Sequence, residues 1–201
     1  MSEFINTVDV LGDDAVCDGI ITKTLTEYLD NTIVSIGEYA LYNCTALINV
    51  NLPIVTSIGL FGFYSCSSLK TANLSLVELI DNYAFYNCLS LESIYIPLVA
   101  NIGKSAFYGC SKISSIDIPS VTSIDAKAFN NCSLLATVIL RNETMCKLID
   151  IDTFTNTPIT DGTGYIYVPS ALVETYTSDT NWSVYSHQIR AIEDYTDIVG
   201  G

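Results

Sequence analysis

The sequence has few basic residues. Lys and Arg number 8 against 22 Asp and Glu among 201 residues, which gives a formal net charge of −14. Proteins that bind nucleic acid or anionic lipid need a basic stripe or cluster, and this composition offers none. We therefore expect no nucleic acid partner. Hydrophobic residues make up 49% of the chain, which excludes a disordered acidic tail.

Long apolar runs are missing as well. No run of 18 or more apolar residues occurs, so the sequence predicts no transmembrane helix and no membrane insertion. Residues 1–6 contain neither a basic nor an apolar region, so no signal peptide is recognisable there.

The residue patterns of enzymes and metal sites are also scarce. His187 is the only histidine, and no G-x-S-x-G, H-E-x-x-H or Walker-type glycine motif occurs. Acidic stretches at 150–152 and 161–164 suggest calcium only weakly, because they lack the loop spacing and terminal Glu of a calcium site. The other acids are interpreted as surface residues. We expect no enzymatic activity, no cofactor and no metal site.

A 22-residue repeat dominates the middle of the chain. Cysteines, isoleucines, small residues and apolar or aromatic residues each recur five times at this interval. The four columns are Cys44, Cys66, Cys88, Cys110 and Cys132; Ile36, Ile58, Ile80, Ile102 and Ile124; Ala40, Gly62, Ala84, Ala106 and Ala128; and Leu41, Phe63, Phe85, Phe107 and Phe129. Agreement of several columns over five periods predicts a repeat architecture.

Each repeat contains an apolar–variable–apolar stretch, such as Ile94-Tyr95-Ile96, which predicts a strand with alternate side chains inward. The segment before each Ile-Gly pair, such as 121–124, is a candidate second strand, and the A-F-Y-x-C stretch a candidate helical or 3₁₀ turn. No repeat buries its apolar residues alone, so stacking must bury them. We expect a repeat solenoid, α/β to mainly β, with one short parallel sheet on its concave face and short helical turns opposite.

The repeats divide the chain into four parts. Residues 1–34 are predicted to form an N-terminal cap with a degenerate first repeat, 35–144 five full repeats, 145–169 a degenerate last repeat, and 170–201 a partly helical C-terminal cap. Caps are expected because each end of a stack must hide an apolar face from water. Trp182, the only tryptophan, is expected to pack on the last repeat.

The degenerate repeats keep the pattern at a longer interval. Leu11 matches Ile36, and Ile149 matches Ile124, each at an offset of 25 residues. The second shift follows an insertion near residues 141–147.

The pattern L-x-x-I-x-I-P with V-x-x-I-G-x-x-A-F-x-x-C, over about residues 11–169, resembles the bacterial BspA-like leucine-rich repeat family. The flanks, residues 4–10 and 167–183, are similar to ends found on such repeats in gut bacteria and their prophages. The resemblance implies a right-handed leucine-rich-repeat stack. It also implies an adhesin-like binding protein of a cell surface or virion, without enzymatic activity. It implies no particular partner, because members of the family bind very different ones.

Two columns invite a chemical interpretation but favour a structural one. The cysteines are interpreted as small buried apolar groups, since equivalent side chains in a stack point the same way rather than at each other. Cys17 and Cys146 lie off this column and have no evident role. The tyrosines that follow the Phe column are interpreted as a ladder supporting neighbouring turns; they are Tyr42, Tyr64, Tyr86 and Tyr108.

The outward side of the predicted strands is the candidate binding surface, because the core does not need these identities and solenoids commonly bind through such a face. Its proposed binding residues are Asn51, Asn73, Tyr95, Asp117, Ile139, Tyr165 and Tyr167. We expect a non-enzymatic module that engages a protein or glycan on another surface, located at the cell surface, outside the cell or on a virion. The alternative is a structural or receptor-binding component of a phage virion or surface fibre.

Overall fold

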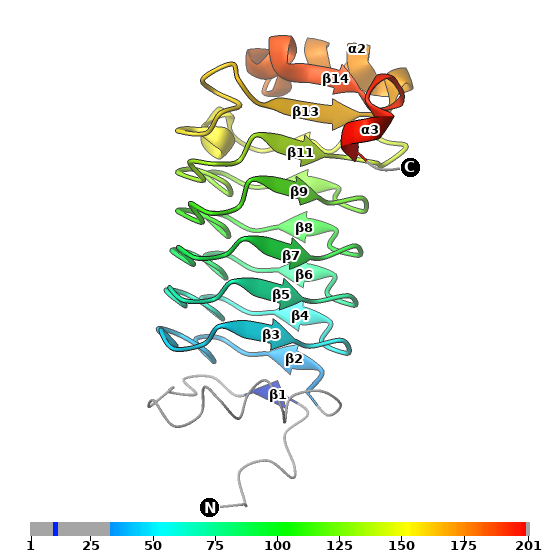
Figure 1. The fold of residues 1–201 in the computed structure, drawn as a ribbon. Coiled ribbons are helices and arrows are strands. Elements are labelled where there is room, and N and C mark those ends of the chain that lie inside the picture. The colour runs from blue at the N-terminus through cyan, green and yellow to red at the C-terminus, as the bar shows by residue number, and fades with distance from the viewer. Residues whose placement is uncertain (1–9, 12–32, 200–201) are drawn as a thin grey trace, which may run out of the picture.

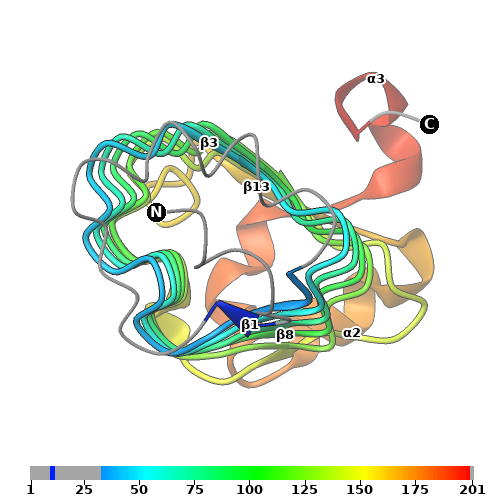
Figure 2. The ribbon, with the colours of Figure 1, turned by 90° about the horizontal axis from the view of Figure 1, so that it is seen from below.

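The chain forms a stack of repeats about one axis. This computed structural model describes residues 10–11 and 33–199 (Figure 1). Seen along the axis, the repeats lie over one another as a flattened ring (Figure 2). The repeat solenoid expected from the sequence is therefore confirmed.

The stack carries parallel strands on two faces rather than on one. A short-strand sheet joins two-residue strands in the order β1-β2-β4-β6-β8-β10-β12. Its strands are β1 Val10–Leu11, β2 Ser35–Ile36, β4 Ser57–Ile58, β6 Leu79–Ile80, β8 Asn101–Ile102, β10 Ser123–Ile124 and β12 Lys147–Leu148. These are the candidate second strands of the repeat. In β2, β4, β6, β8, β10 and β12 the second residue, an isoleucine or leucine, is buried, and the strands pair in register from repeat to repeat.

The opposite side carries the longer strands and is called the long-strand face below. One sheet has the order β3-β5-β7 and another β9-β11-β13-β14. Their bounds are β3 Asn49–Asn51, β5 Thr71–Asn73, β7 Ser93–Tyr95, β9 Ser115–Asp117, β11 Thr137–Ile139, β13 Tyr165–Val168 and β14 Ile189–Ala191. The expectation of a single sheet is thus wrong, because each full repeat contributes one strand to each face.

The A-F-Y-x-C stretches form hydrogen-bonded turns, and no helix occurs between residues 33 and 150, so the expected helical turns are also wrong. Two residues of each turn have left-handed backbone, such as Tyr83 at φ 59° and Asn87 at φ 56°. This conformation interrupts a helix. Alternate backbone N–H groups bond to the next repeat, as where Phe85 N donates to Ala106 O at 2.7 Å, while those between them bond within the turn, as where Ala84 N donates to Asp81 O at 3.3 Å.

The core is a set of columns along the stack. Phe63, Phe85, Phe107, Phe129 and Phe154 stack with ring centroids 4.9–5.6 Å apart and ring planes within 6°. Four thiols, those of Cys66, Cys88, Cys110 and Cys132, each donate to a carbonyl of the preceding repeat at 3.1–3.2 Å. Burial raises the pKa of the Cys88, Cys110 and Cys132 thiols. The predicted core ladder of buried thiols is therefore confirmed for these four cysteines, whereas Cys44, the first of the column, is disulfide-bonded, which the sequence did not predict.

The ends follow the predicted register in part. Leu11 of β1 pairs with Ile36 of β2, as the offset of 25 predicts, whereas Cys17 and the other residues of the predicted N-terminal cap between 12 and 32 lie outside the described residues. At the other end Leu148, not Ile149, pairs with Ile124. The match of Ile149 to Ile124 is therefore wrong by one residue, because the extra residue lies further on, in the 3₁₀ helix η1 (Ile151–Phe154).

The C-terminal cap closes the short-strand sheet with side chains. It contains η2 Ser170–Leu172, α2 Val173–Ser178, η3 Trp182–Gln188, η4 Ile192–Asp194 and α3 Thr196–Val199, besides β14. Trp182 is fully buried beside Phe154, as predicted, and its Nε1 donates to Cys146 O at 2.7 Å. Asn181 Nδ2 donates to Leu148 O at 2.8 Å. These bonds satisfy backbone groups at the edge of β12, where a further strand could otherwise pair.

None of the helices in the described part of the chain has the length and hydrophobicity needed to span a membrane.

Candidate binding face

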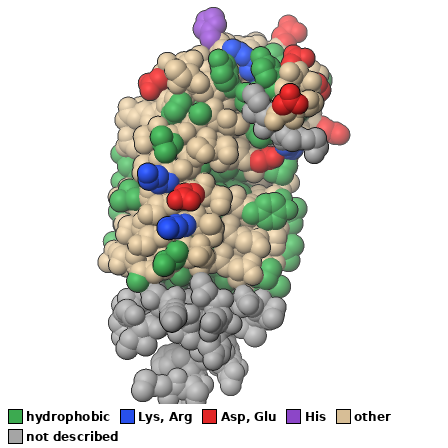
Figure 3. Space-filling view, viewed as in Figure 1, with side chains coloured by type: hydrophobic (Ala, Val, Ile, Leu, Met, Phe, Trp, Pro, Cys, Tyr) green, Lys and Arg blue, Asp and Glu red, His purple; other side chains and the backbone are tan. Residues whose placement is uncertain are grey.

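The long-strand face presents side chains that the core does not use. In β3, β5 and β9 the middle residue is buried and the two flanking residues are exposed. Asn51, Asn73, Tyr95 and Asp117 therefore lie outward in four neighbouring strands, as the sequence predicted. Figure 3 shows this side of the molecule, where uncharged polar surface predominates and the few charged side chains gather in small groups.

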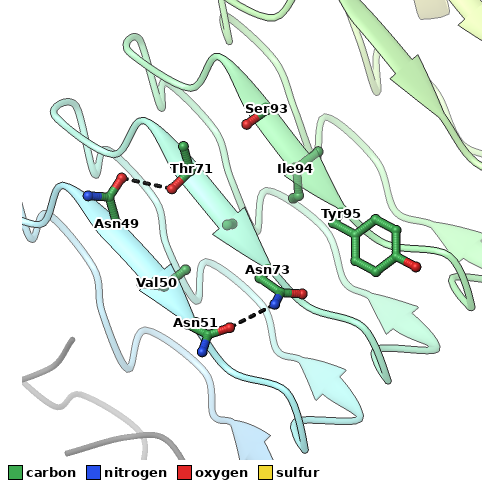
Figure 4. A pocket seen from close by; sticks show the side chains of 9 residues that line it. Asn49, Val50, Asn51, Thr71, Asn73, Ser93, Ile94 and Tyr95 are labelled. Carbon is green, nitrogen blue, oxygen red and sulfur yellow. Dashed lines mark hydrogen bonds between the residues drawn. The ribbon is translucent and has the colours of Figure 1, made fainter. Parts of the chain in front are cut away.

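Hydrogen bonds between repeats orient the polar side chains of β3 and β5 (Figure 4). Thr71 Oγ1 donates to Asn49 Oδ1 at 2.7 Å, and Asn73 Nδ2 donates to Asn51 Oδ1 at 2.7 Å. Each amide can make further bonds, because a carboxamide has two N–H donors and an oxygen with two acceptor sites. The ladder therefore fixes rows of neutral donors and acceptors along the surface.

Tyr95 is the most exposed large hydrophobic residue of the face, with 59% of its surface accessible. It lies between two depressions. One, of about 680 Å³, is lined by residues of β3, β5 and β7, and the other, of about 410 Å³, by residues around β7 and β9. Ser93, Ile94 and Tyr95 line both, so the two depressions meet at β7.

The second depression coincides with a break in the sheet, called the seam below. Strands β7 and β9 do not pair, and Figure 1 shows them set further apart than their neighbours. Leu74 N donates to Tyr95 O at 2.9 Å and Ile118 N to Ile139 O at 3.0 Å, but between these repeats the equivalent bond from Ile96 N to Asp117 O is not formed.

The side chain under the seam confirms that the repeats separate there. Ile94 is only half-buried, whereas the equivalent middle residues Val50, Ala72, Ile116 and Val138 are buried. The short-strand sheet remains paired at the same level, with β8 bonded to both β6 and β10. The separation is therefore confined to the long-strand face.

Asp117, across the seam from Tyr95, carries an ion pair. Arg141 Nε donates to both carboxylate oxygens at 2.9 and 3.2 Å, and one of its terminal nitrogens lies 2.9 Å from Oδ2. Such a bidentate pair neutralises the carboxylate locally. The only acid among the predicted site residues thus adds little negative charge to the face.

The C-terminal half of the face is covered. Ile139 and Tyr167, predicted to be exposed, retain only 6% and 2% of their accessible surface, because Ile192 and Tyr195 pack over them. The prediction that these two lie open to a partner is therefore wrong. Tyr165 is partly buried, and the Arg190 guanidinium lies 4.5 Å from the centre of its ring. Only the part of the face from β3 to β9 is open.

Other candidate chemical groups have structural surroundings. Asp150 accepts the Asp152 N–H at 2.8 Å and so caps η1, which accounts for the first of the two stretches that suggested calcium, residues 150–152. The described residues contain no group of three or more His, Cys, Asp or Glu side chains placed to hold a metal ion. Cys146 is a buried free thiol, and its backbone carbonyl accepts the Trp182 Nε1–H at 2.7 Å.

Aromatic ladders line the turns. The predicted ladder is confirmed, with rings 4.7–4.9 Å apart and nearly parallel from Tyr42 through Tyr64 and Tyr86 to Tyr108. A second ladder, Tyr39–Phe61–Tyr83, stacks beside it and was missed. Its signal was an aromatic residue at the same position in three successive repeats.

Comparison with known proteins agrees with this geometry. The family described as BspA type leucine rich repeat region matches residues 22–136 and 56–174, with six copies. The chain belongs to this family. A search of curated proteins gives no match.

Solved structures of leucine-rich repeat proteins are similar to this chain. A leucine-rich repeat protein from Bacteroides ovatus is 24% identical, over 81% of this chain and 40% of its own, with a TM-score of 0.61. A leucine rich cell surface protein from Faecalibacterium prausnitzii is 25% identical over 71% of this chain and 45% of its own, with a TM-score of 0.47. This chain therefore spans less than half the length of either protein.

Proposed function

We propose that the chain is a non-enzymatic recognition module that binds a protein or glycan at a cell surface or outside the cell. The proposed contact surface is the open part of the long-strand face, from β3 to β9. The observation that carries the proposal is the combination of an exposed Tyr95 with ordered amide side chains at positions that the fold leaves unconstrained. Solenoid proteins commonly use such extended strand faces for binding.

Two further features support this choice of face. The depressions over β3, β5 and β7 and over the seam place concave surface beside an aromatic side chain, which is typical of an interaction anchor. The short-strand side instead exposes single apolar residues such as Leu79, which need no functional explanation. The family membership agrees with a repeat module that acts by binding.

The test is binding of the purified chain to a panel of host-surface proteins and glycans by biolayer interferometry. Tyr95→Ala and Asn73→Asp should each weaken binding about tenfold or more, because they remove the anchor or add a charge to the neutral ladder. Leu79→Ala is the matched control, since Leu79 is 44% exposed in a strand of the other face. Circular dichroism confirms that each variant is folded.

Unchanged binding by folded Tyr95→Ala and Asn73→Asp would contradict the proposed face. Binding of no panel member by the folded wild-type protein would contradict a recognition role for the isolated chain. It would favour the alternative of a structural or receptor-binding component of a virion or surface fibre.

A further inference from the structure

We propose that the seam beside Tyr95 binds an uncharged oligosaccharide, with one sugar unit seated between β7 and β9. The inference rests on the proposed function and names the chemical class of the partner. It depends on three observations: backbone groups that face the seam without pairing, an exposed aromatic ring at its side, and the scarcity of unpaired charge around it.

At the seam, backbone donors and acceptors are left without the bonds between repeats that their equivalents make elsewhere on the face. Ile96 N and Asp117 O are not bonded to each other, and neither are Ser114 N and Glu92 O, although the equivalent groups of other repeats are joined, as Lys70 N is to Ile48 O at 2.7 Å. Unpaired backbone groups need a partner outside the sheet. A sugar hydroxyl suits this position because it can donate and accept at once.

Tyr95 supplies an apolar surface for the face of a sugar ring. It is the only large apolar side chain among the outward residues of β3, β5, β7 and β9; the others are Asn49, Asn51, Thr71, Asn73, Ser93, Ser115 and Asp117. Protein–protein interfaces typically have an apolar core with several anchors. One ring among amides and hydroxyls fits a polyhydroxylated ligand better than a protein surface.

The charge of the surroundings favours a neutral ligand. No residue lining the depression over β3, β5 and β7 is charged. At the seam the carboxylates are those of Asp117, paired with Arg141, and Glu92. The chain as a whole carries −14, which repels anionic polymers at a distance. Uncharged sugars avoid this repulsion, whereas uronic acid or sulfated chains do not.

The polar ladder extends the site toward β3. The oriented amides of Asn73 and Asn51 continue along the stack from Tyr95, one strand apart, at a spacing of about 4.8 Å. A chain of several sugar units can therefore meet one amide per repeat after its first unit occupies the seam. We expect longer oligosaccharides to bind more tightly than single sugars.

The experiment titrates the folded chain with uncharged hexasaccharides, namely cellohexaose, laminarihexaose and mannohexaose, and with hexagalacturonate as a charged probe, followed by NMR. We expect at least one uncharged probe to bind at least about tenfold more tightly than hexagalacturonate. Tyr95→Ala should weaken this binding about tenfold, Tyr95→Phe should restore it, and Leu79→Ala should leave it unchanged. The amide signals of Ile96 and Ser114 should shift on binding.

Failure to bind any uncharged probe would overturn the inference, as would binding that leaves the Ile96 and Ser114 amides unaffected. Preference for hexagalacturonate would overturn it too. If a panel protein binds in a Tyr95-dependent manner while the sugars do not, this inference fails and the proposed function stands. If nothing binds through Tyr95, both fail.

Discussion

The two strand faces come from the same repeats but differ in continuity. The short-strand sheet runs unbroken from β1 to β12, and its end is closed by Asn181 and Trp182. The long-strand face is divided at the seam, and Ile192 and Tyr195 cover its C-terminal part. The comparison indicates that one side, together with the core columns, holds the stack together, while the other has an opening that stability does not require.

Raising the pH should destroy the scaffold that both faces share, and this is the largest effect we expect. Burial raises the pKa of Cys132 and Cys146 to about 12 from an ordinary value of 9.0. The stability from keeping such thiols neutral is fully present below pH 9 and is lost as the pH rises toward 12, at about 1.4 kcal/mol per pH unit for each thiol. Circular dichroism should therefore show unfolding within this range.

Replacing Cys132 by alanine provides the control for the alkaline transition. The variant removes one titrating thiol, so its stability should fall less steeply with pH than that of the wild type. A wild-type protein that keeps its full stability up to pH 12 would contradict the buried thiol ladder.

A substitution in the core should destabilise the protein much more than a substitution on the binding face. Phe85 is fully buried between Phe63 and Phe107, at 4.9 and 5.3 Å, so Phe85→Ala should lower the free energy of unfolding by about 3–5 kcal/mol. Tyr95→Ala, on the exposed face, should lower the free energy of unfolding by less than about 1 kcal/mol. Urea denaturation measures both, and equal losses would refute the assignment of inside and outside.

A pair of isoleucines tests the seam itself. Ile116 is buried, so Ile116→Ala should lower the free energy of unfolding by about 2–4 kcal/mol. Ile94 at the equivalent position is only half-buried, so Ile94→Ala should lower it by about half as much. The same denaturation series compares the two variants. Equal costs would indicate that β7 and β9 close up in solution.

The ion pair beside the seam should matter least for stability. The Asp117 and Arg141 side chains are 42% and 32% exposed, so Asp117→Asn should change the free energy of unfolding by less than about 1 kcal/mol. The change should shrink further at high salt, because screening weakens exposed pairs. A loss well above this limit, insensitive to salt, would show that the pair holds the face together.

Much of the scaffold follows from the sequence. The 22-residue columns predict the stack, the Phe and Cys columns predict the core, and the alternation around Tyr95 predicts which residues of β3 to β9 face outward. These predictions succeed because stacked repeats place equivalent residues in equivalent surroundings.

Part of what the sequence could not predict depends on contacts outside the repeat. Ile139 and Tyr167 follow the outward pattern, but residues 192–195, which have no repeat counterpart, bury them. The seam has no sequence signature, because Ile94 has the same type as buried Ile116. The left-handed backbone at Tyr39, Phe61 and Tyr83 could not be predicted either, because bulky residues seldom adopt this conformation.

Hydrogen exchange at the seam tests the central claim most directly. The amide of Ile96 should exchange much faster than those of Leu74 and Ile118, its bonded equivalents in the neighbouring repeats, and should become protected when a ligand binds. Equal protection of the three amides in the free protein, or no change at Ile96 in a bound one, would contradict an open seam that serves as the binding site.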